Sequence, residues 1–311
     1  MTLTTTSFGT RATAAEVLDG VDLSGRRMIV TGGASGLGTE TVRALAGAGA
    51  QVTVATRNPA AADPLVEEFP GTRAVALDLA DLASVRAFCD AWSGPVDGLI
   101  ANAGVMMLPT RQVNAQGWEM QLATNYLGHF ALAVGLRTAL QAAEKPRVVV
   151  VSSGAQLRVG FDFDDPQFER RAYDPFVAYA QSKTAGVLLT VGISRRWAEH
   201  GITANACTPG WIHTNLARHV APATMQALGV MDADGELVTP DYYKTPAQGA
   251  ATTVLLAASP LLDGVTGRYF DDNQESEVVD GGPDATAGVA KWSVDPATAD
   301  RLWEYALPVV A

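Results

Sequence analysis

Thr31-Gly32-Gly33-Ala34-Ser35-Gly36-Leu37-Gly38 is the stretch that decides the fold, because it joins a short apolar run to an alanine-rich segment. The apolar run from Arg26 to Thr31 predicts a buried strand, and the alanine-rich segment predicts a helix. A glycine-rich turn between such elements presents backbone N–H groups and a helix N-terminus to a phosphate. The glycines at 32, 36 and 38 differ in spacing from the common GxGxxG pattern. The stretch therefore predicts the start of a dinucleotide-binding fold.

Short apolar runs rich in β-branched residues recur along the chain, and helical patterns separate most of them. The runs are Met28-Ile29-Val30, Val52-Thr53-Val54-Ala55, Ala74-Val75-Ala76-Leu77, Leu99-Ile100-Ala101, Val148-Val149-Val150-Val151, Ile202 to Ala206 and Tyr269-Phe270. This alternation predicts βαβ units and a parallel sheet buried on both faces. No internal repeat or low-complexity linker is visible. We therefore expect a single α/β domain over residues 1–311, with a Rossmann-type doubly wound parallel sheet.

A second stretch, Tyr179-Ala180-Gln181-Ser182-Lys183, carries candidate chemistry. If the segment is helical, the phenol and the ammonium lie four residues apart on one face. A lysine beside a tyrosine favours the phenolate, so the tyrosine can exchange a proton near neutral pH. The alternative is a solvated lysine near a packed tyrosine. Together with the glycine-rich turn, the pattern indicates hydride transfer.

The chain resembles the classical short-chain dehydrogenase/reductase family over nearly its whole length. The TGxxxGxG turn of that family is met by the glycine-rich turn above, and its NNAG element by Ala101-Asn102-Ala103-Gly104, with the first Asn replaced. Three further elements match: Asn125 to Phe130, the strand Val148 to Ser153, and Pro209-Gly210 with Thr214. The resemblance implies an NAD(P)-dependent oxidoreductase that acts on a carbonyl or an alcohol.

A narrower resemblance concerns the segment between Ser153 and Tyr179, which is longer than in compact family members. This longer segment is similar to the retinol-dehydrogenase-like and WW-domain-oxidoreductase-like branch. The same similarity holds for Asn125 to Phe130 and for the N-terminal lead-in, residues 1–25. No WW domain is expected, because the tryptophans do not form a paired module. Light-dependent protochlorophyllide reductases share much of the same pattern.

The family roles imply a catalytic set of Asn125, Ser153, Tyr179 and Lys183. Tyr179 would be the general acid/base, and Ser153 would hydrogen-bond the substrate oxygen. Lys183 would hold the nicotinamide ribose and depress the pKa of Tyr179, and Asn125 would anchor a water that links Lys183 to solvent. Ser152 has similar chemistry, but alternation along a strand sends it to the other face.

The expected cofactor-binding residues follow the strand ends. They are Gly32, Ser35, Gly36, Leu37, Gly38, Arg57, Asp78, Leu79, Asn102, Ala103, Gly104, Tyr179, Lys183, Pro209, Gly210, Ile212 and Thr214. Asp78 resembles the family's adenine-contacting acid, although it could equally be a turn acid. Asn102 resembles the residue that supports the central strand.

The choice of cofactor depends on the residues after the second strand. NAD-binding folds usually place a carboxylate there for the ribose 2′-hydroxyl, whereas this chain has Thr56-Arg57-Asn58. A guanidinium binds a 2′-phosphate bidentately. We therefore expect NADP(H) rather than NAD(H), the alternative being that Arg57 is simply exposed.

Two other functions stay open: a non-catalytic dinucleotide-binding sensor or scaffold, and an NAD-dependent alcohol dehydrogenase of the same fold. Loss of catalytic residues would mark the sensor, yet all four are present. An epimerase or dehydratase of the extended subfamily is disfavoured, because its TGxxGxxG turn needs glycine where Ser35 stands.

Composition limits the partners. The formal net charge of −11 disfavours nucleic acid and anionic membranes. Two cysteines, Cys89 and Cys207, are too few for a disulfide framework. No signal peptide and no apolar run of membrane-spanning length is readable in the sequence. We therefore expect a cytoplasmic protein. The histidines show no metal-ligand spacing and the acids Asp162, Asp164 and Asp165 lack the calcium-loop pattern. No metal is expected.

Two long segments lie outside the alternation. Residues 211–245 carry Met225, Met231, Tyr242 and Tyr243, and connections of this length are often functional. In the family this region usually forms the substrate lid, and its Met and Tyr content suits an apolar or aromatic substrate. The tail, residues 281–311, is expected to pack back on the sheet edge or the pocket.

The run from Leu122 to Leu140 is apolar on nearly every face. A helix that buries only one face should show a polar stripe. We therefore expect a partner subunit on its outer face, in a homodimer or homotetramer, unless the insertion before Tyr173 covers it.

Overall fold

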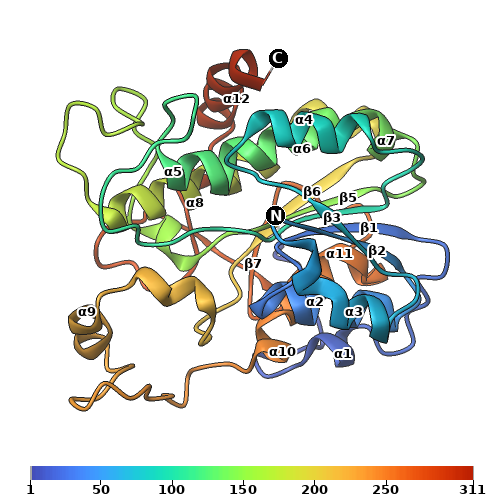
Figure 1. Ribbon diagram of the computed structural model, residues 1–311, viewed down its shortest axis with the longest axis horizontal. Coiled ribbons are helices and arrows are strands. Elements are labelled where there is room, and N and C mark those ends of the chain that lie inside the picture. The colour runs from blue at the N-terminus through green and yellow to red at the C-terminus, as the bar shows by residue number, and fades with distance from the viewer. Residues whose placement is uncertain (1, 311) are drawn as a thin grey trace.

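The computed structural model describes residues 2–310, so Met1 of the lead-in and Ala311 of the tail lie outside the described residues. Its centre is an eight-stranded sheet with the order β3-β2-β1-β4-β5-β6-β7-β8 (Figure 1). The strands are β1 (Arg27–Thr31), β2 (Gln51–Thr56), β3 (Arg73–Ala76), β4 (Gly98–Ala101), β5 (Arg147–Val151), β6 (Thr203–Cys207), β7 (Tyr269–Asp271) and β8 (Gln274–Glu275). The first seven are parallel, which confirms the doubly wound sheet, while β8 pairs antiparallel with β7.

Helices cover both faces of the sheet, as Figure 1 shows. They are α1 (Ala14–Val17), α2 (Gly36–Gly47), α3 (Asp63–Glu68), α4 (Leu82–Asp90), α5 (Met120–Leu122), α6 (Gly128–Gly135), α7 (Arg137–Gln141), α8 (Pro175–Arg196), α9 (Pro222–Ala227), α10 (Pro246–Gly249), α11 (Ala251–Ala258) and α12 (Pro296–Val310). Strand β5 shows why the strands read as continuous apolar runs. Val148 and Val150 pack in the core with α6 and α8, whereas Val149 and Val151 pack in the core with α2 and α11. Both faces of the strand are therefore buried.

The apolar run from Leu122 to Leu140 is not one regular helix, contrary to our expectation. A π-helical turn, Ala123–Leu127, separates α5 from α6, and Leu136 ends α6 before α7 begins. Asn125 lies in the π-helical turn. Single π-helical turns inside helices occur frequently at functional sites.

Part of the outer face of this run, around Tyr126 and Phe130, is covered by the chain's own C-terminal helix. In α12, Trp303 makes an edge contact with Phe130, with ring centroids 4.8 Å apart, and another with Trp197 at 5.6 Å. The Tyr126 hydroxyl donates to the carbonyl of Leu302 at 3.4 Å. The patch around Tyr126 and Phe130 is therefore buried within one chain, and the homodimer or homotetramer stays a prediction.

Two smaller features complete the fold. The lead-in runs beside β8, where the amide of Thr4 donates to Glu275 Oε2 at 2.8 Å. After β8 the chain forms a two-stranded parallel pair, β9 (Val278–Val279) and β10 (Val289–Ala290). Within residues 2–310, no helix is long and apolar enough to cross a membrane.

Candidate active site

A cavity of about 1900 Å³ opens where the parallel strands end. Ligands of open α/β sheets bind at this edge, where the strand order reverses, which here is between β1 and β4. The cavity is larger than the ~300–1,000 Å³ typical of a site for one small ligand. All seventeen predicted cofactor-binding residues line it, and so does Ser153.

The glycine-rich turn has the geometry of a phosphate cradle. Gly32 and Gly36 have φ of +65° and +54°, which favours glycine. A Cβ on Gly38 would lie 2.3 Å from the carbonyl oxygen of Gly32. The Ser35 side chain does not cap α2, so the first N–H groups of this helix stay available for an anion. This turn fits the pyrophosphate of a dinucleotide.

We expect Gly38→Ala to weaken NADPH binding by at least about tenfold, because the turn must open and one charge-assisted contact is worth roughly 1.5–3 kcal/mol. Gly47→Ala in the same helix is the control, since its Cβ would meet only Phe69, at 4.0 Å. Titration of NADPH fluorescence measures both affinities, and circular dichroism checks folding. Equal affinities in the two variants would show that the turn does not cradle the cofactor.

Asn102 supports the central strand as predicted. Its Nδ2 donates to the carbonyl of Thr31 at 2.8 Å, while Thr31 Oγ1 accepts from the amides of Asn102 and Ala103 at 2.9 and 3.0 Å. The glycine-rich turn and the element after β4 are therefore held together directly.

His129 does not line the cavity but contacts two residues next to it, a role that the sequence did not predict. Its ring is buried, with Nε2 2.9 Å from Thr31 Oγ1 and Nδ1 3.1 Å from the carbonyl of Asn125. Burial lowers the pKa of His129 to about 4, so the ring is neutral at pH 7. Because a carbonyl can only accept, Nδ1 carries the proton and Nε2 accepts from Thr31. The only advance signal was its spacing of four residues from Asn125.

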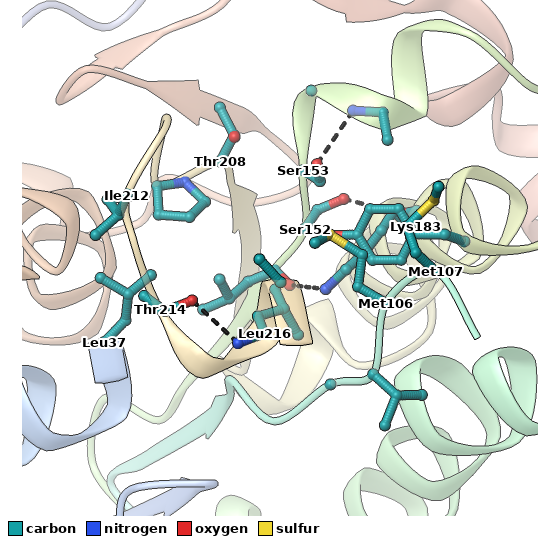
Figure 2. Close-up of a pocket in the computed structure, with 18 of the residues that line it drawn as sticks. Leu37, Met106, Met107, Ser152, Ser153, Lys183, Thr208, Ile212, Thr214 and Leu216 are labelled. Carbon is teal, nitrogen blue, oxygen red and sulfur yellow. Dashed lines mark hydrogen bonds between the residues drawn. The ribbon is translucent and has the colours of Figure 1, made fainter. Parts of the chain in front are cut away.

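Ser153, Tyr179 and Lys183 come together on one wall of the cavity. Ser153 follows β5, and Tyr179 lies in the first turns of α8. Lys183 Nζ donates to the carbonyl of Val151 at 2.9 Å and lies 5.7 Å from the centre of the Tyr179 ring. Ser152 also lines the cavity, but its hydroxyl donates to the carbonyl of Lys183 at 2.9 Å (Figure 2).

The expectation that Lys183 depresses the pKa of Tyr179 is not met in this structure. Burial raises the pKa of Tyr179 to about 12, and the neighbouring Ser153 side chain offsets only part of this rise. Burial also lowers the pKa of Lys183 to about 8. Both shifts have one cause: each group is buried and loses hydration, which disfavours its charged form.

Asn125 is the predicted catalytic residue that does not line the cavity. Its Oδ1 accepts from the amide of Val105 at 2.8 Å, and its Nδ2 donates to the carbonyl of Val105 and to Ser182 Oγ. A Cβ on Gly104 would lie 3.0 Å from Asn125 Oδ1 and 3.6 Å from Lys183 Nζ. Asn125 therefore lies directly behind the wall that carries Lys183.

Arg57 and Asp78 lie at the ends of β2 and β3. Arg57 is exposed on the cavity, and among residues 2–310 no hydrogen bond or ion pair engages its guanidinium. Asp78 Oδ1 accepts from the amide of Ala80 at 2.9 Å, so part of its role is that of a turn acid.

Several apolar side chains also line the cavity. Met106 and Met107 follow β4, Phe176 and Val177 begin α8, and Figure 2 shows both methionines on the same side of the cavity as Lys183. Leu37, Ile212 and Thr214 lie on the opposite side in this view.

The expected lid also contributes to the wall. Trp211, Met225, Tyr242 and Tyr243 line the cavity. Met231 does not; it forms an isolated bridge with Leu237 instead.

Asp162 and Asp165 bind neighbouring groups of the chain itself. Asp165 accepts from the amides of Glu169, Arg170 and Arg171, and Asp162 pairs with Arg171 at 3.0 Å. No group of three His, Cys, Asp or Glu side chains that could hold a metal is present in the described part of the chain.

A doubly wound sheet with a phosphate-binding turn and a Ser–Tyr–Lys group on one cavity defines a dinucleotide-dependent oxidoreductase. The profile of the short chain dehydrogenase family matches residues 26–224. The chain belongs to this family and is an NAD(P)-dependent enzyme that acts on CH–OH or C=O groups.

Relatives agree with this assignment. The chain is 63% identical over 290 residues to a probable oxidoreductase of Streptomyces lividans, covering 92% of this chain and 97% of the relative. It is 34% identical to human retinol dehydrogenase 14 over 88% of this chain and 85% of that protein, in agreement with the expected branch.

Solved structures show the same fold. A Mycobacterium paratuberculosis protein is similar at a TM-score of 0.73 and 32% identity, over 96% of this chain and 97% of that one. A gluconate 5-dehydrogenase of Burkholderia cenocepacia, in complex with NADP and tartrate, is similar at a TM-score of 0.61 and 26% identity, over 81% and 95% of the two chains.

Proposed function

We propose that this protein is an NADP(H)-dependent oxidoreductase that interconverts the carbonyl and alcohol forms of an apolar or aromatic substrate. The observation that carries the proposal is that Ser153, Tyr179 and Lys183 line the same cavity as the glycine-rich turn. A bound nicotinamide dinucleotide would supply or accept the hydride.

The chain's own residues handle the proton. In reduction, the Tyr179 hydroxyl donates its proton to the carbonyl oxygen; in oxidation, Tyr179 removes the proton of the alcohol. Ser153 holds the same oxygen and so fixes the reacting carbon. Lys183, kept in place by the carbonyl of Val151, holds the nicotinamide ribose and supplies positive charge next to Tyr179. Asn125 positions the backbone behind Lys183.

The apolar character of the substrate is supported by the composition of the wall. Phe176, Trp211, Leu228 and Tyr242 are large side chains that remain exposed, and all four line the cavity. Exposed apolar groups that gather at one concave site favour an apolar ligand. We propose that residues 211–245 close over such a ligand as a lid.

NADP(H) is proposed as the cofactor because Arg57 has no partner in the described chain and lies at the end of β2. We expect Arg57→Ala to weaken NADPH binding about ten- to a hundredfold, because a charge-assisted hydrogen bond contributes roughly 1.5–3 kcal/mol. NADH binding should hardly change. Titration with both nucleotides measures the effect, and Arg86→Ala, which removes an exposed arginine outside the cavity, is the control.

Equal losses of NADPH and NADH affinity in Arg57→Ala would contradict this assignment, and tighter binding of NADH by the unchanged protein would favour the NAD-dependent alternative. A panel of aldehydes, ketones and alcohols, followed at 340 nm with each cofactor, tests the activity itself. A protein that binds NADPH but turns over none of the panel would favour the sensor or scaffold.

A further inference from the structure

Part of the cavity wall comes from the C-terminal tail. Pro283, Ala285, Thr286, Ala287 and Gly288 all line the cavity, far along the chain from the residues that carry the motifs. None of these side chains is charged, and none is large. The tail therefore contributes only small side chains to this part of the cavity wall and leaves the adjoining cavity space unfilled.

This segment is fastened to the turn that follows Ser153. The amide of Gly282 donates to the carbonyl of Leu157 at 2.8 Å. Gln156, which is fully buried, donates from Nε2 to the carbonyl of Gly288 at 3.1 Å and accepts at Oε1 from the amide of Ala290 at 3.0 Å. Both ends of the segment are therefore tied to the turn Gly154–Leu157, which begins next to Ser153.

Trp292 fixes the segment from behind. Its Nε1 donates to the carbonyl of Gln156 at 3.0 Å. Its ring is packed so closely against Gly281 that a Cβ there would lie 2.4 Å from the ring, and a Cβ on Gly160 would lie 3.6 Å from it. Gly281 also has a φ of +78°, so a larger residue could not take its place without strain. These contacts hold both ends of the segment in place.

We propose that residues 283–288 form the substrate-side wall and set the length of the apolar group that the site accepts. The wall belongs to the substrate side because it is anchored beside Ser153, whereas the phosphate turn follows β1. Its small side chains leave space for an extended hydrocarbon chain that the methionines and Phe176 would also contact. The substrate class is therefore aldehydes or ketones with a long apolar chain, an inference that rests on the proposed function.

The test compares Ala287→Phe with Ala297→Phe. Both alanines are exposed in the tail, but only Ala287 lines the cavity. The assay offers each protein straight-chain aldehydes from butanal to dodecanal together with NADPH. Because one methylene of pocket space changes selectivity about 10–200-fold, we expect Ala287→Phe to lower kcat/KM for decanal and dodecanal at least about tenfold. Butanal turnover and NADPH affinity should match those of Ala297→Phe and the unchanged protein.

A parallel measurement needs no turnover. The fluorescent dye 1-anilinonaphthalene-8-sulfonate is titrated into the NADPH complex of each protein, and Ala287→Phe should bind it about tenfold more weakly. If the unchanged protein reduces no aldehyde, the proposed function fails for this substrate class. The dye titration alone then tests whether residues 283–288 limit the length of the bound apolar group. The same aldehyde profile in all three proteins would overturn the proposal that residues 283–288 set the accepted chain length. Where no aldehyde is reduced, the same dye affinity in all three proteins would overturn it.

Discussion

Tyr179→Phe should lower kcat by about 10²–10⁴-fold, the usual contribution of general acid–base catalysis, while NADPH still binds. Only the phenolic oxygen is removed, so the packing of α8 is preserved. Stopped-flow or steady-state assays at 340 nm measure the loss, and NADPH fluorescence measures the binding. Reduction needs the phenol, so the rate should fall as the pH rises through the pKa of Tyr179; oxidation needs the phenolate and should fall as the pH drops below it.

Tyr173→Phe is the matched control, because the Tyr173 hydroxyl donates to Glu119 Oε1 at 3.1 Å and does not line the cavity. Near-normal kcat in Tyr179→Phe would remove this residue from the proton transfer. A loss of NADPH binding in the same variant would show that it acts through the cofactor site instead.

Trp303→Ala should lower the free energy of unfolding by about 3–5 kcal/mol, as expected for a buried aromatic residue replaced by alanine. Trp303 is 7% exposed and touches Phe130 and Trp197, and the Arg196 guanidinium lies 4.9 Å from the centre of its ring. Gly192 leaves room for the ring, because a Cβ there would lie 2.8 Å from it. Urea denaturation measures the change.

Trp211→Ala provides the comparison, since Trp211 is 53% exposed and its removal should change the unfolding free energy by no more than about 0.5 kcal/mol. Similar stability of the two variants would mean that α12 contributes little to the core. Self-association of Trp303→Ala in light scattering is also expected, because the face with Tyr126 and Phe130 loses its cover.

The local features of the site could be predicted from the sequence because each depends on a few neighbouring residues. The glycine-rich turn, the buried strands and the Tyr179–Lys183 spacing are set by steric limits and by the repeat of the helix or strand. Since parallel strands all end at one edge of the sheet, these predictions also place the cofactor residues together. The structure accordingly puts all of them around one cavity.

Only the tertiary structure decided the features that depend on burial and on contacts between distant segments. The raised pKa of Tyr179 reflects the loss of hydration at that position. The bonds from His129 to Thr31 and from Gln156 to the tail join segments whose separation in sequence carries no periodic signal. The packing of α12 over Phe130 could not be predicted either, because an apolar face in the sequence does not specify which surface will bury it.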